Sequence, residues 1–279
     1  MLKSVNWWLL YAGIAREDFY LNHAADMADL HYLPLYAGKF SLKDDKLYYE
    51  GRAVNDEDLP RNVLRRGNFG NRIHDYFERK GVRVVNNSVA QKNCDDKLIG
   101  HKIVDYLGLP QPKYRHFRNQ ASYERISGEL GVPFVAKNRF GMCGKEVYFI
   151  DNEQGLEKIY DEHPEKEILF QEFVGDPNKK QAQDIRMMVV GGKVIGAITR
   201  TNRNGRRANV SQGAVAKPVS VSGRLCKRAL DIAAVHKGEV LSVDFFTDGR
   251  FCEANATPDT KPFADMGIDK AIVDYITRT

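Results

Sequence analysis

Two carboxylate side chains near the end of the chain are predicted to face one another across a β-hairpin. Residues 238–255 read GEVLSVDFFTDGRFCEAN, and the Asp-Gly pair in this segment is typical of a two-residue turn between right-twisted strands. Counting outward from that turn pairs Phe245 with Cys252 and Asp244 with Glu253. Carboxylates placed directly opposite each other are destabilising unless a positive charge lies between them.

A third oxygen donor is expected on the same face of this hairpin. Asn255 lies two residues beyond Glu253, and because side chains alternate along a strand, its amide points the same way as the carboxylate. Together with Asp244 these residues form an all-oxygen set that suits Mg²⁺ or Mn²⁺. The alternative is a solvated sheet face, but a facing pair of like charges favours the metal site. Because Mg²⁺ usually binds few carboxylates together with substrate phosphates, a phosphate site is expected nearby.

A glycine-containing turn is a candidate for holding those phosphates. Residues 137–150 read KNRFGMCGKEVYFI, a polar turn between two apolar runs. It is not a Walker A loop, because Gly144-Lys145 is followed by Glu146 and no glycine stands five positions before Gly144. A loop between two strands also lacks a helix N-terminus behind the phosphates. The remaining alternatives are an ordinary hairpin tip and a flap whose backbone N–H groups close over phosphates, with Lys137 as a fixed charge.

The elements that position these segments are predicted from hydrophobic periodicity and from the placement of glycine and proline. Strands are expected at 6–11, 82–85, 133–137, 146–150 and 168–174, followed by two hairpins, the first turning at Gly191-Gly192. Helices are expected at 17–30, 70–80, 95–107, 123–130, 154–161, 222–235 and 268–276. This is a mixed α+β (α/β) layout, and 279 residues suit two or three lobes.

The composition is that of an ordinary globular protein with a mildly basic surface. Hydrophobic residues make up 43% and charged residues 28% of the chain, enough to bury a sizeable core. The formal net charge of +5 suits anionic ligands such as nucleotides or acidic peptides. The densest basic stretch, residues 200–207, carries asparagines where a nucleic-acid binder would carry stacking aromatics, so nucleic acid is not an expected partner.

The cysteines, and the apolar run near the N-terminus, bear on the cellular compartment. The four cysteines are scattered without a CxxC pair, which indicates a reducing compartment. The apolar run at residues 7–15 is short and rich in aromatics, so a buried first strand is preferred over a signal peptide. No other stretch is long and apolar enough to span a membrane. The protein is expected to be cytoplasmic, without a membrane partner.

Five segments, taken in order, resemble the ATP-grasp ligases, and most closely the RimK-like α-L-glutamate ligase branch. They are CDDKLIGHKIVDYLGLPQP, PFVAKNRFGMCGKEV, ILFQEFV, DIRMMVVGGKVIGAITR and the hairpin that carries Asp244. Each segment is a weak signal alone, but their order and spacing are those of the family. The resemblance covers nearly the whole chain and is strongest from Cys94 onward.

The resemblance implies a set of ATP-binding residues. The two lysines of this set would reach the phosphates, the glycines would form the flap, the hinge strand would bind adenine, and the aspartate would lie near the ribose. The implied residues are Lys97, Lys137, Gly141, Gly144, Gln171, Glu172, Phe173, Val174, Asp184 and Asn209. Taken alone, Lys97 would be an ordinary solvated helix charge.

The resemblance also implies catalytic and metal-binding residues. Arg186 and Arg200 would face the reaction centre, together with Arg207 from the basic loop. The metal ligands would be the hairpin oxygens described above, which would hold a pair of Mg²⁺ or Mn²⁺ ions beside ATP. The alternative for the loop arginines, Arg203 and Arg206 included, is a solvated loop.

The sequence departs from the family pattern in three places. Glu146 stands where many members have another flap glycine, and it is expected to stiffen the flap. Ser211-Gln212 replace a His-Arg pair, and residues 256–263, ATPDTKPF, replace a turn of small residues. The last two regions border the acceptor pocket of the family, so these departures concern the acceptor rather than ATP or metal binding.

The resemblance implies an ATP-grasp fold with three lobes. These are a Rossmann-like pre-ATP-grasp domain (1–88), a central lid subdomain (89–170) and a C-terminal subdomain built on an antiparallel sheet (171–279). The implied function is that of an ATP-dependent carboxylate–amine ligase, which forms an amide through an acyl phosphate and adds glutamate or a similar amino acid to a peptide, protein tail or cofactor. The alternatives are another amino-acid or peptide ligase of a biosynthetic pathway and a nucleotide-binding regulatory protein without turnover. Dimers or tetramers are usual in such ligases.

Overall fold

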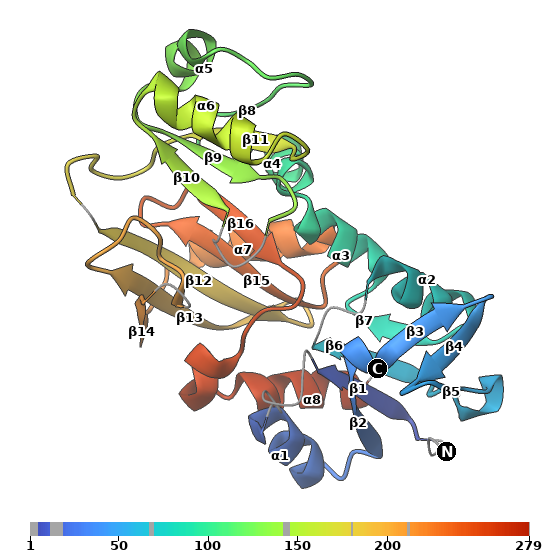
Figure 1. Cartoon of the computed structure of the whole chain (residues 1–279). Coiled ribbons are helices and arrows are strands. Elements are labelled where there is room, and N and C mark those ends of the chain that lie inside the picture. The colour runs from blue at the N-terminus through green and yellow to red at the C-terminus, as the bar shows by residue number, and fades with distance from the viewer. Residues whose placement is uncertain are drawn as a thin grey trace.

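The computed structural model describes residues 5–11, 19–66, 70–141, 146–179, 181–210 and 213–278. Within these ranges the chain forms the helices and strands labelled in Figure 1. In chain order they are β1 (Trp7–Tyr11), α1 (Phe19–Met27), β2 (Tyr32–Tyr36), β3 (Phe40–Lys43), β4 (Lys46–Tyr49), β5 (Arg52–Ala53), β6 (Asn62–Arg66), α2 (Asn71–Arg79), β7 (Arg83–Val85), α3 (Ser88–Asp95), α4 (Lys97–Tyr106), β8 (Tyr114–His116), α5 (Tyr123–Leu130), β9 (Phe134–Asn138), β10 (Val147–Ile150), α6 (Glu153–Glu162), β11 (Ile168–Glu172), β12 (Ala182–Val190), β13 (Lys193–Asn202), β14 (Val215–Pro218), α7 (Gly223–His236), β15 (Val240–Phe246), β16 (Phe251–Asn255) and α8 (Ile268–Arg278). None of these helices is long and apolar enough to cross a membrane.

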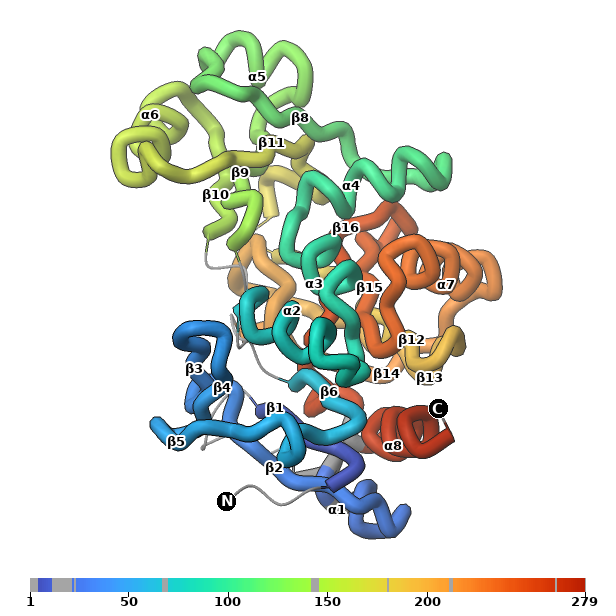
Figure 2. Tube along the Cα trace, turned by 90° about the vertical axis from the view of Figure 1, so that its right-hand side faces the viewer, coloured from blue at the N-terminus to red at the C-terminus, as the bar shows by residue number. Residues whose placement is uncertain are grey.

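The N-terminal sheet is parallel and packs on both of its faces. Its strand order is β2-β1-β6-β7. On β1, Trp8 and Leu10 pack toward α2 and the small sheet β3-β4-β5, whereas Trp7 and Leu9 pack toward α1 and α8. These two helices come from opposite ends of the chain and lie side by side in both views (Figures 1 and 2). A strand buried on both faces explains why the apolar run of β1 is continuous rather than alternating.

A second sheet, which we call the lid sheet, has the order β10-β9-β11-β8 and stands above the rest of the molecule in Figure 1. Its outer face, which includes Phe134 and Phe170, packs against α5 and α6. The pairing of β9 with β10 and β11 leaves Lys137, Phe149 and Gln171 on the opposite, inner face. The inner face of the lid sheet is therefore the one that carries functional groups.

The third sheet has five strands in the order β14-β13-β12-β15-β16. One face is apolar and is covered by α7 and part of α4. The other face is apolar only at one end, where Met188 and Val190 pack under α8. Toward the start of β12 the same face carries Asp184 and Arg186 instead. The hairpin predicted at Gly191-Gly192 is confirmed, because both glycines adopt positive φ between β12 and β13.

The turn of the second hairpin differs from its prediction. It contains three residues rather than the two-residue Asp248-Gly249 turn, because Phe246 N–H donates to the Arg250 carbonyl at 2.8 Å and Gly249 N–H donates to the Phe246 carbonyl at 2.9 Å. Gly249 has φ +82°, which suits the left-handed position that ends such a turn. The predicted pairing next to the turn was therefore wrong.

A β-bulge in the same hairpin restores the predicted register at the candidate metal site. Phe245 pairs with Phe251 instead of Cys252, and Cys252 is the extra residue of the bulge. Beyond it, Asp244 pairs with Glu253 as predicted. The three-residue turn and the bulge shift the register in opposite directions and cancel.

The predicted helix at 95–107 corresponds to α4, which begins after a break at Asp96, and the separate helix α3 before it was not predicted. The backbone of Asp96 is extended, and its side chain accepts hydrogen bonds from the N–H groups of Leu98 and Ile99. An aspartate cap of this kind stops the preceding helix and starts the next. The break places Lys97 at the first turn of α4.

Asn86 joins the N-terminal sheet to the five-stranded sheet. It follows β7, is 1% exposed, and donates through Nδ2 to the carbonyls of Val240 at 2.6 Å and Ala256 at 2.5 Å. Its Oδ1 accepts from the N–H groups of Glu239 and Val240 at 2.7 and 2.8 Å. All four hydrogen-bonding capacities of the amide are used, and they fix the first residue of β15 and the residue that follows β16.

We predict that Asn86→Ala destabilises the protein far more than Asn87→Ala. The first change strands four buried backbone groups, at about 1–3 kcal/mol each before relaxation, so we expect a loss of about 3–5 kcal/mol. The second removes the cap of α3, whose Oδ1 accepts from Ala90 N–H, for about 1 kcal/mol. Denaturant unfolding of both variants measures the difference, and equal losses would contradict the role given to Asn86.

Candidate active site

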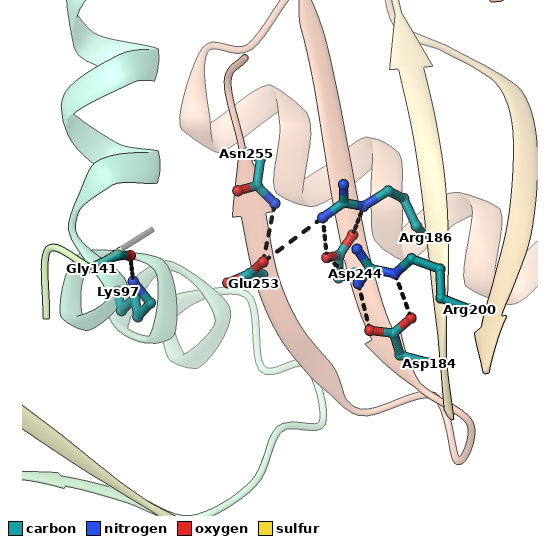
Figure 3. A network of polar contacts seen from close by, with 8 residues as sticks. All are labelled: Lys97, Gly141, Asp184, Arg186, Arg200, Asp244, Glu253 and Asn255. Atoms are coloured by element: carbon teal, nitrogen blue, oxygen red, sulfur yellow. Dashed lines mark hydrogen bonds and ion pairs between the residues drawn. The ribbon is translucent and has the colours of Figure 1, made fainter. Parts of the chain in front are cut away.

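One face of the five-stranded sheet carries a connected network of arginines and carboxylates (Figure 3). Arg186 on β12 lies opposite Asp244 on β15, and its Nε and Nη2 donate to the two carboxylate oxygens at 2.8 and 2.7 Å. Arg200 on β13 lies opposite Asp184, donates to it through Nε at 2.7 Å, and reaches Asp244 Oδ2 through Nη2 at 2.7 Å. The register of three neighbouring strands thus brings two predicted catalytic arginines onto one carboxylate.

Both aspartates of this network are removed from solvent. The Asp244 side chain has no exposed surface, and burial acts to raise its pKa. Arg186 and Arg200 outweigh burial, so that the pKa of Asp244 is lowered and the carboxylate stays charged. For Asp184, burial prevails over Arg200 and raises the pKa to about 6. Because removing one partner leaves an uncompensated buried charge, the members of the network hold one another in place.

Glu253 is the carboxylate that these arginines leave open. Its Oε1 lies 3.8 Å from Arg186 Nη2 and 3.4 Å from Asn255 Nδ2, both longer than the contacts of Asp244. Its side chain also keeps 30% of its surface exposed. A cation that reaches this face therefore meets an incompletely paired carboxylate at Glu253.

The predicted metal ligands fit a hard divalent cation. Asp244 accepts three hydrogen bonds, and since a carboxylate offers about four lone-pair directions, one direction at Oδ1 remains. The amide of Asn255 carries an oxygen as well as the nitrogen now near Glu253, and a half-turn exchanges them. In the part of the chain that the structure describes, no three His, Cys, Asp or Glu side chains could hold a metal together, so water or phosphate oxygens would complete its shell. The set Asp244, Glu253 and Asn255 stays a prediction.

Lys97 lies across from this face, at the start of α4 (Figure 3). Its Nζ donates to the carbonyl of Gly141, at the beginning of the predicted flap. Burial lowers the pKa of Lys97, the charge of Glu253 acts to raise it, and nearby Lys137 lowers it further. Lys97 therefore lies within electrostatic reach of both the open carboxylate and Lys137.

Lys137 lies on the inner face of the lid sheet. It is 9% exposed, and its Nζ donates to Oε1 of Gln171 at 2.7 Å. Burial and then the charge of Lys137 lower the pKa of His101 on α4 to about 4. The predicted phosphate lysine is thus held by a residue of the predicted adenine strand and lies close to α4.

A clasp between α4 and the flap was not predicted from the sequence. Arg139 donates through Nε and Nη2 to the two oxygens of Asp96, at 2.7 and 2.5 Å, and through Nη1 to Glu167 at 2.5 Å. The Arg139 carbonyl accepts from Lys97 N–H at 3.1 Å. The side chain that caps α4 therefore also ties down the start of the flap, which sets where Lys97 and Gly141 meet.

Glu146, the departure from the family pattern, closes the base of the flap. Its Oε2 accepts from Asn138 Nδ2 at 2.8 Å and its Oε1 pairs with Lys166, which lowers the pKa of the carboxyl. A Cβ added to Gly141 would lie 2.7 Å from Oε2 of Glu146, so a larger residue here would displace the Glu146 side chain. The expected stiffening of the flap stays a prediction. Gly144 lies outside the described residues.

The predicted adenine-binding residues lie where β11 leaves the lid sheet. Glu172 is paired with Arg250 of the C-terminal hairpin. Phe173 meets the ring of Phe149 edge-on, with centroids 6.0 Å apart. The guanidinium of Arg206 lies 5.7 Å from the centre of the Phe149 ring and 5.9 Å from the centre of the Phe173 ring. Val174 follows, half-buried. Glu172 thus lies apart from the network of Figure 3.

The basic loop after β13 reaches the lid sheet. Arg207 donates through Nη2 to the Val147 carbonyl of β10, and its own carbonyl accepts from Asn202 Nδ2 at 2.9 Å. The carbonyl of Asn209 accepts from Ala214 N–H at 3.3 Å. Arg207 is therefore a lid contact in this structure and does not join Arg186 and Arg200, the other two predicted catalytic residues.

Comparison with known proteins places the chain in a family. A model described as the RimK-like ATP-grasp domain matches residues 94–276. The chain belongs to the RimK-like ATP-grasp family. The resemblance drawn from five sequence segments is thereby confirmed, and the match includes every residue of Figure 3.

Two relatives of this RimK-like chain are named as ligases. The coenzyme γ-F420-2:α-L-glutamate ligase of Methanococcus maripaludis is 29% identical over 198 residues, which are 69% of this chain and 69% of the relative. The α-aminoadipate–LysW ligase LysX of Saccharolobus solfataricus is 32% identical over 180 residues, or 61% of this chain and 63% of the relative. The predicted class, an ATP-dependent carboxylate–amine ligase, agrees with both names.

Solved structures confirm the predicted ATP-grasp fold. A RimK domain ATP-grasp protein from Sphaerobacter thermophilus matches with a TM-score of 0.72 at 17% identity, over 97% of this chain and 98% of that one. The ATP-grasp ligase PsnB, complexed with a minimal precursor, matches with a TM-score of 0.73 at 15% identity, over 100% and 99%. PsnB has also been solved with its minimal precursor, Mg and ADP.

We predict that Arg139→Lys raises the KM for ATP about tenfold, because lysine keeps the charge but loses the two-pronged contact with Asp96, a change of about 1.4 kcal/mol. Arg125→Lys is the matched control, since Arg125 lies on the outer helix α5 with a side chain 64% exposed. Steady-state kinetics at varied ATP measure both. A KM for ATP that stays at the wild-type value in Arg139→Lys would remove the clasp from the account of ATP binding.

Proposed function

We propose that this RimK-like protein joins a carboxylate to an amine at the expense of ATP, through an acyl phosphate. Its favoured reaction adds glutamate or a similar amino acid to a peptide, a protein tail or a cofactor. The observation that carries the proposal is the face of β12, β13, β15 and β16. There, arginines neutralise a buried carboxylate, Glu253 stays open, and Lys97 of α4 lies opposite.

The electrostatic difficulty of the reaction is to bring an anionic carboxylate to a polyanionic nucleotide. In the proposal, Lys97 and Lys137 contact the phosphates from α4 and the lid sheet. Asp244, Glu253 and Asn255 would hold Mg²⁺, or Mn²⁺, as a pair of ions. The metal would neutralise phosphate charge and polarise the P–O bonds of the phosphoryl group whose phosphorus is attacked.

The remaining nucleotide contacts are proposed along the hinge and the flap. Gln171, Glu172, Phe173 and Val174 would bind adenine, and Phe173 brings an aromatic ring that already packs against Phe149. Asp184 would approach the ribose. The backbone groups of Gly141 and Gly144 would close over the phosphates, while Asn209 would contact the nucleotide and Arg207 would act as a catalytic residue from the same basic loop.

The chemistry proceeds in two balanced steps. A carboxylate oxygen attacks the γ-phosphorus of ATP, and the bond to ADP breaks, which gives an acyl phosphate. An amine then attacks the acyl carbon, and the resulting oxyanion collapses with loss of inorganic phosphate. Arg200 and Arg186 would stabilise the transferring phosphoryl group and the oxyanion. No dedicated base is assigned, since the departing phosphate can take the proton of the amine.

A closed flap would protect the acyl phosphate from water. The clasp of Arg139 with Asp96 and the contacts of Glu146 hold both ends of the flap against the rest of the molecule. Exclusion of water matters here because hydrolysis of the acyl phosphate would waste ATP. This supports ligation rather than simple ATP hydrolysis as the outcome.

The substrate class rests on charge and on the relatives. The names of the relatives describe glutamate added to coenzyme F420-2 and α-aminoadipate joined to LysW, and PsnB was solved with a precursor. Residues 203–207 give this chain a basic loop beside the lid, which suits an acidic acceptor.

We also propose a division into three lobes, but we move the second boundary from the predicted 170 to 172, which gives 1–88, 89–172 and 173–279. The reason for this change is that β11 pairs with β9 and β8 to its end, so it belongs to the lid sheet.

We predict that a matching carboxylate stimulates ADP release from ATP, and that hydroxylamine, supplied in place of the amine, accumulates a hydroxamate. Hydroxylamine attacks an acyl phosphate, whereas it leaves a free carboxylate unchanged. The screen pairs L-glutamate and glutamyl peptides with other carboxylates and amines, and measures ADP and hydroxamate together. If no carboxylate stimulates ADP release, the proposed ligase function fails. The alternative, a regulatory protein that binds nucleotide without turnover, is then favoured.

A further inference from the structure

The N-terminal sheet presents a second ligand-binding edge that the roles assigned so far do not use. Its parallel strands run in the order β2-β1-β6-β7. The chain leaves β1 for β2 on one side and later enters β6 on the other side, so the topological switch point lies between β1 and β6. In open parallel sheets, ligands bind outside the carboxyl ends of the strands at such a point.

A cationic side chain stands at this switch point. Tyr11 ends β1 and Arg66 ends β6, and the two residues pair in register. Arg66 is half-buried, points to the same face as Leu64, and donates through Nη2 to Oγ1 of Thr260 at 3.4 Å. Arg65, the neighbouring arginine, points to the other face, where its Nη1 lies 2.9 Å from Nδ1 of His74. Of the two arginines, Arg66 is therefore the one on the side of the five-stranded sheet.

The carboxyl edge of the N-terminal sheet lies next to the end of β16, the strand that carries two of the candidate metal ligands. Asn86, at the carboxyl end of neighbouring β7, hydrogen-bonds to the backbone of Val240 at the start of β15. It also donates to the Ala256 carbonyl, directly after Asn255 at the end of β16. Thr260, the partner of Arg66, is 2% exposed and lies in the segment that leaves β16. The face of Leu64 also packs in one core with Met188, which shares its face of β12 with Arg186. Arg66 is thus held between the switch point and the end of the metal-binding strand.

The reaction requires a cation in addition to those at the phosphates. An amino acid that attacks through its amine keeps its own carboxylate throughout, and that carboxylate must be bound without reacting. Arg186 and Arg200 are bound to Asp244 and face the phosphoryl group in the proposed function. A planar guanidinium matches a carboxylate through two parallel hydrogen bonds.

We propose that Arg66, supported by Thr260, binds the α-carboxylate of the incoming amino acid, and so orients its amine toward the acyl phosphate. This inference rests on the proposed function and adds to it a residue that selects the nucleophile. The segment 256–263, a departure from the family pattern, supplies Thr260 and so belongs to the amino-acid site.

The test compares Arg66→Gln, Arg66→Lys and the control Arg72→Gln, which changes an exposed arginine of α2. With the amino acid that best supports ADP release in the wild type, we expect Arg66→Gln to raise the KM for that amino acid at least tenfold. The KM for ATP should stay within twofold, and Arg66→Lys should be intermediate because it loses only the two-pronged contact. Arg72→Gln should match the wild type.

A second measurement separates recognition from folding. The same amino acid is offered as its α-amide, which keeps the amine and loses the carboxylate charge. The wild type should discriminate against the amide at least tenfold in kcat/KM, and Arg66→Gln should lose that discrimination. Unchanged discrimination in Arg66→Gln, or an equal rise in the KM for ATP, overturns the role of Arg66. If no amino acid stimulates ADP release in the wild type, the proposed function itself fails and this inference falls with it.

Discussion

The buried carboxylate of Asp244 is the constraint on which the site depends. With no exposed surface, it stays charged only because Arg186 and Arg200 donate to it from two neighbouring strands. Those donors require β12, β13 and β15 to keep one register, and Arg200 requires Asp184 on the same face. The same pairing leaves Glu253 incompletely matched, and we propose that a cation binds there.

Polar contacts help to bring the other parts of the site to this face. Asn86 attaches the edge of the N-terminal sheet to the start of β15 and to the residue after β16 through four hydrogen bonds. Arg139, just before the flap, donates to both carboxylate oxygens of Asp96, the cap of α4. The N-terminal sheet and the five-stranded sheet share one apolar core, in which Leu9 and Leu64 pack with Met188, whereas the outer face of the lid sheet has a core of its own. The lid sheet can therefore shift without exposing the core that the other two sheets share, which suits an enzyme whose lid must open for ATP and close for chemistry.

Sequence reasoning found the helices and strands with strong periodicity, and it found Asp244 opposite Glu253. It reached that pairing through a turn one residue too short, and the bulge at Cys252 compensated, because bulges leave no clear mark in a single sequence. It missed α3, because the sequence SVAQKNCD has few apolar residues to set a helical period, and it began the next helix one residue before the break at Asp96. It also missed Asn86 and Arg139, whose types are common in turns and on surfaces and whose partners lie far away in the chain. The roles of the ATP and metal residues remain predictions, because they concern groups outside the chain.

The most direct test of this account is the Mg²⁺ dependence of ADP binding in Glu253→Gln, measured by isothermal titration without any second substrate. The account predicts that Mg²⁺ tightens ADP binding to the wild type at least tenfold, about 1.4 kcal/mol, and that Glu253→Gln loses this effect but still binds ADP without metal. Asp231→Asn on α7, which covers the opposite face of the sheet, should behave as the wild type. If Glu253→Gln keeps the full Mg²⁺ effect, the open carboxylate is not a metal ligand and the central claim is wrong.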